Sequence, residues 1–168
     1  MVTKFDKHKK EEYDFILDFL KNNFNYDFYI THNNVRNYIS DMSNLKMFLK
    51  ECKNVFVLQE DENFKGLISI WESTSDFQRN YIKINALNKD ACNKLLTVLL
   101  WNTKKDLYIK LRKDSNYIEV FKNKGFKFQG GRGCQILLKR KYRPELMNSK
   151  VNKEAHSECN NSNNTNIG

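Results

Sequence analysis

The spacing of apolar residues switches repeatedly along this chain between a helix-type and a strand-type period. Apolar residues three and four positions apart occur over residues 10–23, 35–52 and 90–102, with a break expected near Ser43-Asn44. Runs rich in β-branched and aromatic residues occur at 54–59, 66–71, 81–86 and 107–111. This alternation predicts a sheet flanked by helices, with the first three of these strands forming an antiparallel meander.

The last part of the pattern predicts a short helix and a closing hairpin. Asp114 and Ser115 are good N-caps for a helix at 116–124, and Gly125 follows it as a C′ glycine. Strands at 126–128 and 134–138 then surround a turn at 130–133, and a short first strand is expected at 2–5. The predicted fold is α/β (α+β), a mixed and mostly antiparallel sheet in the order β-α-α-β-β-β-α-β-α-β-β.

Composition divides the chain at its single proline, Pro144. Residues 1–143 hold enough apolar material for one domain with one core. Residues 144–168 are rich in Asn and nearly free of apolar side chains, so we predict a disordered tail. Neither a bilayer-length apolar run nor a secretory signal is visible, which predicts a cytoplasmic protein without membrane contact.

The cysteines and histidines are too scattered to predict a metal site or a disulfide framework. We expect Cys52, Cys92 and Cys134 to be small buried side chains and Cys159 to be a free thiol in the tail. Trp71 and Trp101 are expected in the core.

The net charge of +9 comes almost entirely from one segment. Residues 103–143 carry 13 Lys and Arg against 3 Asp and Glu, whereas residues 1–102 carry 14 of each. Such a segment attracts anions, which include a nucleotide-bearing cofactor, a nucleic acid and an acidic protein. An exposed lysine-rich surface is the simpler interpretation, because heavy Asn and Lys usage is typical of an AT-rich genome. That composition would suit a phage or other mobile element.

The element order resembles the GNAT superfamily of acyl-CoA N-acyltransferases over almost the whole domain. Two segments carry the resemblance most specifically. The run from Phe121 to Phe126, followed by 131–133, is similar to the helix of the family that ends in Tyr-x-x-x-Gly-Phe before the last two strands. The strand 81–87 leads into a helix that contains Leu95-Leu96. The resemblance implies that strands 81–87 and 107–111 separate near the start of that helix.

In the family, this strand–helix junction binds acetyl-CoA through strand backbone groups and helix N-terminal amides. The resemblance therefore implies a cofactor site, whose expected members are Ile84, Ala86, Leu87, Asn88, Lys89, Ala91, Cys92, Asn93, Lys94 and Ser115. The family pattern Gln/Arg-x-x-Gly-x-Gly/Ala is replaced at its three defined positions by Leu87, Asp90 and Cys92. Asp90 would repel a pyrophosphate unless it turns away, for instance as the N-cap of the helix. Lys89 and Lys94 offer compensating charge.

The resemblance also implies catalytic positions. A tyrosine four residues before the Gly-Phe often protonates the CoA thiolate in the family, and Phe121 stands there. Tyr117, one turn earlier, is the alternative acid. Glu72, at the end of the preceding strand, is the best candidate for a base that deprotonates the amine.

Two functions follow from these residues. The first is an N-acetyltransferase that transfers an acetyl group from acetyl-CoA to an amine acceptor, since positioning and backbone polarisation can act without side-chain catalysts. The second is a GNAT-like binding or structural module that no longer binds acetyl-CoA and uses its basic segment to contact nucleic acid or an acidic protein. The oligomeric state expected for either is a monomer or a homodimer.

Overall fold

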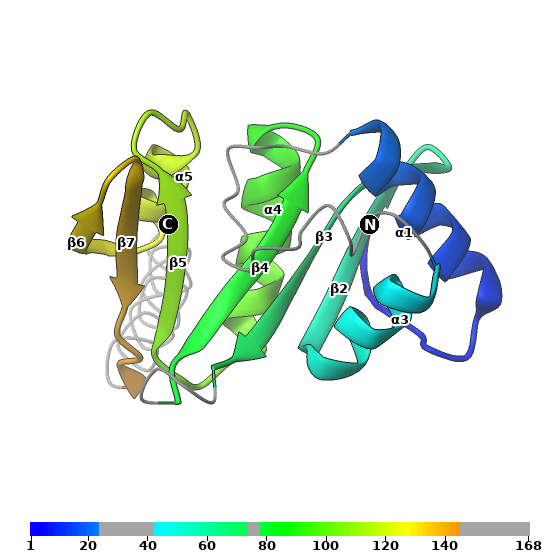
Figure 1. The fold of residues 1–168 in the computed structure, drawn as a ribbon, viewed down its shortest axis with the longest axis horizontal. Coiled ribbons are helices and arrows are strands. Elements are labelled where there is room, and N and C mark those ends of the chain that lie inside the picture. The colour runs from blue at the N-terminus through cyan, green and yellow to red at the C-terminus, as the bar shows by residue number, and fades with distance from the viewer. Residues whose placement is uncertain (24–41, 74–77, 145–168) are drawn as a thin grey trace, which may run out of the picture.

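The computed structural model describes residues 1–23, 42–73 and 78–144, and its elements follow the predicted order (Figure 1). The strands form one seven-stranded sheet in the order β1-β2-β3-β4-β5-β7-β6, antiparallel throughout except between β4 and β5. The elements are β1 (Val2–Lys4), α1 (Lys10–Asn22), α3 (Met42–Glu51), β2 (Lys53–Glu60), β3 (Asn63–Glu72), β4 (Asn80–Ala86), α4 (Lys89–Trp101), β5 (Leu107–Arg112), α5 (Ile118–Asn123), β6 (Lys127–Arg132) and β7 (Gln135–Arg140).

Each face of the sheet packs against a different set of helices because neighbouring strand residues point to opposite sides. Phe56, Leu58 and Ile68 belong to the core that contains α4 and α5. Val55 and Leu67 point the other way, into a second core that contains α1 and α3. Figure 1 shows α1 and α3 over the β2–β3 end of the sheet. The β4–β7 part of that same face is therefore left to polar side chains.

One predicted helix start lies outside the described residues, and another differs from the prediction for a local reason. Residues 35–41 of the predicted helix 35–52 lie outside the described residues, and α3 runs without a break through Ser43-Asn44. The helix predicted at 116–124 begins only at Ile118, because the Ser115 hydroxyl accepts a hydrogen bond from the Tyr117 N–H (3.1 Å). That bond forms a turn before the helix rather than a cap.

The closing hairpin turns later than predicted. Gly130 and Gly131 lie inside β6, and the turn is Gly133-Cys134, between the paired residues Arg132 and Gln135. Gly133 has a positive φ of 62°, which the first central position of a tight two-residue hairpin turn can require. The two earlier glycines instead accompany a register shift between Phe128 and Gly130.

Two side chains expected in the core are exposed. Trp101, at the end of α4, is 69% exposed because the buried stripe of the helix, which includes Leu99 and Leu100, lies on its other side. Cys134 is exposed in the hairpin turn, whereas Cys92 is buried as expected and Cys52 is half-buried. None of the helices in the described ranges is long and apolar enough to span a membrane.

Candidate functional site

The central strands β4 and β5 separate shortly after they meet. They pair in parallel only at Asn80 with Leu107 and at Tyr81 with Tyr108, although both strands continue for several residues. Figure 1 shows the two strands diverging toward the end of β4 that leads into α4. The separation expected near the start of the 90–102 helix is thus present in the backbone.

This separation leaves part of the β4 backbone without a strand partner. Leu87 donates its N–H to the Lys65 carbonyl of β3 (2.9 Å), and the β3–β4 ladder runs without a register shift. In such a ladder alternate residues bond to β3, so the N–H and C=O groups of Ile84 and Ala86 point toward β5. No β5 residue pairs with them in the described structure, yet the two residues are only 3% and 0% exposed. Buried backbone groups of this kind require a polar partner.

The start of α4 lies at the end of this strand edge. Asn88, not Asp90, is the N-cap, and its side chain accepts a hydrogen bond from the Ala91 N–H (2.9 Å). The N–H groups of Lys89 and Asp90, at the first two helical positions, have no carbonyl partner within the helix. Both residues are exposed, as are Leu87 and Asn88.

The charges at this helix start compensate one another. The Asp90 carboxylate is exposed and forms an ion pair with Lys94 (2.8 Å), four residues later on the helix. Lys94 is also paired with Glu60, and the hydrogen bonds that its ammonium donates to the carboxylates of Asp90 and Glu60 raise its pKa. Lys94 is therefore engaged with carboxylates, while Lys89 has no ion pair among the described residues.

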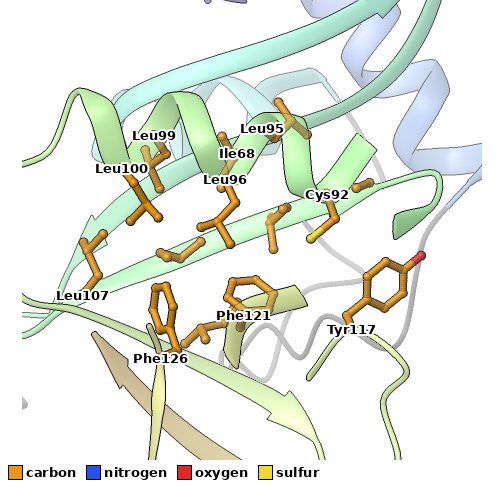
Figure 2. Close-up of a cluster of buried hydrophobic side chains, with 14 of the residues drawn as sticks. Ile68, Cys92, Leu95, Leu96, Leu99, Leu100, Leu107, Tyr117, Phe121 and Phe126 are labelled. Atoms are coloured by element: carbon orange, nitrogen blue, oxygen red, sulfur yellow. The ribbon is translucent and has the colours of Figure 1, made fainter. Parts of the chain in front are cut away.

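The other two substituted positions differ in exposure. Leu87 is 42% exposed, whereas Cys92 is fully buried, and burial raises the pKa of its thiol to about 12. Figure 2 shows Cys92 pointing from α4 toward Phe121 and Tyr117. Phe121 is 0% exposed and packs edge-to-face on Phe126, with ring centroids 5.4 Å apart. These side chains join α4 to α5 as apolar core.

The predicted catalytic residues are not brought together. Glu72 pairs with Asn80, at the end of β4 away from α4, and forms an ion pair with Lys53 (3.0 Å). The hydrogen bond from Lys53 lowers the pKa of Glu72, which makes it a weaker base. Tyr117 is buried in the core between α4 and α5, with its hydroxyl pointing away from Cys92 in Figure 2. Ser115 is buried beside it in the turn before α5.

A polar group that sequence reasoning missed lies on the sheet face opposite α4. Leu67 on β3 points into the α1–α3 core, so Ser69 and Trp71, two and four residues on, share its face. Their partners on β4 are Lys83 and Tyr81. Lys83 is 6% exposed, and burial lowers its pKa to about 8. The alternation of polar and Ile residues over 81–85 is the signal that would have placed Lys83 on this face.

Aromatic rings hold the cations of this face. The Lys83 ammonium lies 5.1 Å from the Trp71 ring centroid, and the Lys110 ammonium lies 5.0 Å from that of Tyr81. The half-buried thiol of Cys52 is near Lys83, and burial raises its pKa to about 11. This thiol therefore remains protonated at neutral pH.

The arrangement of the strands has close counterparts among solved structures. An N-acetyltransferase from Staphylococcus aureus Mu50 matches at 11% identity with a TM-score of 0.66, over 84% of this chain and 96% of that chain. An acetyltransferase of the GNAT family from Streptococcus pneumoniae matches at 9% identity with a TM-score of 0.64, over 85% and 99%. This chain has the GNAT fold. No family model matches the sequence, and no curated protein does.

One structure with this fold was solved with a ligand. The PaiA N-acetyltransferase from Thermoplasma acidophilum, in complex with coenzyme A, matches at 9% identity with a TM-score of 0.58, over 84% of this chain and 98% of that chain. In the present chain, the unpaired edge of β4 leads directly into the exposed start of α4. These two features are built from backbone, so neither depends on particular side chains.

Proposed function

We propose that this chain is an N-acyltransferase that transfers an acetyl group from acetyl-CoA to an amine. The observation that carries the proposal is the edge of β4, where Ile84 and Ala86 are buried but have no strand partner for the groups that point toward β5. An extended ligand that carries amide groups pairs with such an edge as an added strand would. The pantetheine arm of coenzyme A is a ligand of that kind.

The start of α4 fits the phosphate end of the same cofactor. The N–H groups of Lys89 and Asp90 and the positive end of the helix dipole favour a phosphate there. Cys92, at the Gly/Ala position of the family pattern, is buried in the core, and Leu87, at its Gln/Arg position, is partly exposed, so neither side chain blocks this approach. Asp90 lowers the affinity for phosphate, and Lys94 partly neutralises it.

In this proposal, catalysis depends on how the chain positions the thioester and the amine. Acetyl-CoA, when bound, supplies a thioester that is reactive toward amines. A β4 N–H that points toward β5 would donate to the thioester carbonyl oxygen and stabilise the charge that develops on it. Holding the amine against that carbon supplies much of the remaining rate. The proposal uses neither Glu72, which Lys53 holds, nor Phe121, which has no hydroxyl.

The amine would approach from the face of the sheet that carries Lys83. On the other face, Ile82 and Ile84 belong to the same buried core as Leu96 of α4, which leaves no route for a substrate. The face that carries Lys83 also carries Tyr108 and Lys110, which are half-buried and can contact a polar molecule.

The first test is thermal unfolding with and without acetyl-CoA. A ligand that binds only the folded protein adds about 2.7 kcal/mol of stability at a hundred times its dissociation constant, so the melting temperature should rise by several degrees. No rise at millimolar acetyl-CoA would reject the proposal and favour the binding-module alternative. Release of the CoA thiol in the presence of a panel of amines would then identify acceptors.

A charge variant at the helix start sharpens this test. Asp90→Asn removes the carboxylate nearest to the proposed phosphate site and should tighten acetyl-CoA binding several-fold. Asp14→Asn, on the exposed side of α1, changes the net charge equally and serves as the control. Equal affinities for the two variants would show that the phosphates do not lie at the start of α4.

A further inference from the structure

The strand positions on the proposed acceptor face carry several cations and no carboxylate. The residues that point to the opposite face are apolar core members such as Ile82, Ile109 and Leu138, so their neighbours along each strand define this face. The positions concerned on β3, β4, β5 and β7 are Ser69, Trp71, Tyr81, Lys83, Asn85, Tyr108, Lys110, Arg112, Gln135, Leu137 and Lys139.

Aromatic rings lie against the central cations. Lys83 and Lys110 lie over Trp71 and Tyr81, and Lys139 lies 5.3 Å from the Tyr108 ring centroid. Aromatic rings attract an ammonium without neutralising its charge, so its ability to bind an anion is retained. Lys83 and Lys110 are also close enough to interact electrostatically, which concentrates positive charge at one point of the face.

The acids nearby are engaged at the margins. Arg112 pairs with Asp114 (3.0 Å) and Lys139 with Asp106 (3.7 Å), both at strand ends. Lys110, in the middle of β5, has no ion pair among the described residues. It is half-buried and lies beside the point at which β4 and β5 separate.

We infer that the amine acceptor of this chain carries an oxyanion, a carboxylate or a phosphate, and that Lys110 binds it with Lys83 adding to the positive field. This inference rests on the proposed function, which places the amine on this face. The oxyanion of such an amine would pair with the Lys110 ammonium, which has no carboxylate partner in the described part of the protein. A cationic amine without an oxyanion would instead meet like charge, and a neutral amine would leave the charge of Lys110 uncompensated.

The experiment uses Trp71 as a reporter of this face. In a Trp101→Phe background Trp71 is the only tryptophan, and its ring lies beneath the Lys83 ammonium. Its fluorescence is titrated with O-phosphoethanolamine and with β-alanine, and separately with ethanolamine and β-alaninamide, which carry the same amines without the oxyanion. We expect saturable changes with the two acids at millimolar concentration or below and none with the two compounds that lack an oxyanion. Whichever of the two acids binds more tightly shows whether the site prefers a phosphate or a carboxylate.

Lys110→Gln in the same background should weaken acid binding about tenfold or more, as the loss of one charge-assisted hydrogen bond does. Lys127→Gln, at an exposed site on β6, makes the same change in net charge, and this variant should bind the acids as the background does.

The inference is overturned if neither acid gives a saturable change, or if the two lysine variants bind the acids equally well. A melting shift with acetyl-CoA in the absence of acid binding would reject this inference alone. Acid binding without a shift would reject the proposed function alone.

Discussion

Gly66 on β3 is the residue whose replacement the backbone tolerates least. Its φ is +154°, and a Cβ there would lie 2.6 Å from the Asn85 carbonyl oxygen and 2.9 Å from the Ala86 Cα. Both contacts are with the β4 backbone next to the proposed cofactor edge, so a side chain would push β4 away. Gly66→Ala should lower the free energy of unfolding by about 3 kcal/mol in urea denaturation.

Gly130 on β6 provides the matched control for that substitution. A Cβ at Gly130 would meet nothing within 4 Å, and its φ is not in the positive range. Gly130→Ala should therefore change the stability by less than about 0.5 kcal/mol. Equal losses from the two variants would mean that the approach of β3 to β4 is not what requires glycine at position 66.

Lys83 makes the stability of the domain depend on pH. Burial lowers its pKa from 10.5 to about 8, so above pH 8 the unfolded chain binds more protons at this site than the folded one. Stability contributed by this site therefore rises with pH, by about 1 kcal/mol between pH 7 and 9. Urea denaturation of the wild type and of Lys83→Met at both pH values measures this difference. A parallel pH dependence of the two proteins would contradict it.

At the scale of single elements, the start of α4 depends on its cap. The Asn88 side chain accepts the Ala91 N–H, so Asn88→Ala should cost about 1 kcal/mol of stability. Asn93→Ala, at an exposed position of the same helix, makes the same chemical change without removing a cap and should be neutral or slightly stabilising. Thermal unfolding of the pair separates capping from helix propensity. A similar loss in both would argue against Asn88 as the cap.

The elements that the sequence predicted well are those with a long, regular apolar period. The helices at 10–23 and 90–102 and the strand at 81–86 agree with α1, α4 and β4 to within about one residue. The errors lie where one or two hydrogen bonds decide between alternatives. Ser115 looked like a helix cap but forms a turn with Tyr117, and the four residues 130–133 looked like one loop although only Gly133 turns the chain.

The candidate site was predicted in part, for a similar reason. The strand–helix junction follows from local sequence, and Asn88 to Asp90 do lie at its exposed end. The alternation over 81–85 can place Lys83 on the face opposite α4, but its burial depends on which strands and rings surround it. The ion pair of Glu72 with Lys53 likewise joins two strands, so no local sequence pattern predicts it.

At the scale of the whole molecule, the two faces of the central strands have different tasks. The face toward α4 and α5 is apolar and carries most of the core, which fixes β4 and β5 where they separate. The opposite face, beyond the reach of α1 and α3, carries the cations and aromatic rings. Because side chains alternate along a strand, each of these strands can contribute both to stability and to the binding proposed above.

We expect residues beyond Pro144 to be needed neither for folding nor for binding of acetyl-CoA. Its last described contacts are the Arg140 side chain on the Lys124 carbonyl (2.8 Å) and the Tyr142 N–H on the Asp106 carboxylate (2.8 Å). Residues 145–168 contain few apolar side chains, so their removal takes little from any core. A protein truncated after Pro144 should melt within about 1 °C of the full chain and keep the same response to acetyl-CoA.

Truncation after Arg140 is the control because it also removes the bond between Tyr142 and Asp106. Loss of that charge-assisted hydrogen bond should cost about 2 kcal/mol, which lowers the melting temperature by several degrees in a domain of this size. A large loss of stability already in the first truncation would place part of the folded domain beyond Pro144. If both truncations melted like the full chain, the contact of Tyr142 with Asp106 would contribute nothing to stability, and the folded unit would end with β7.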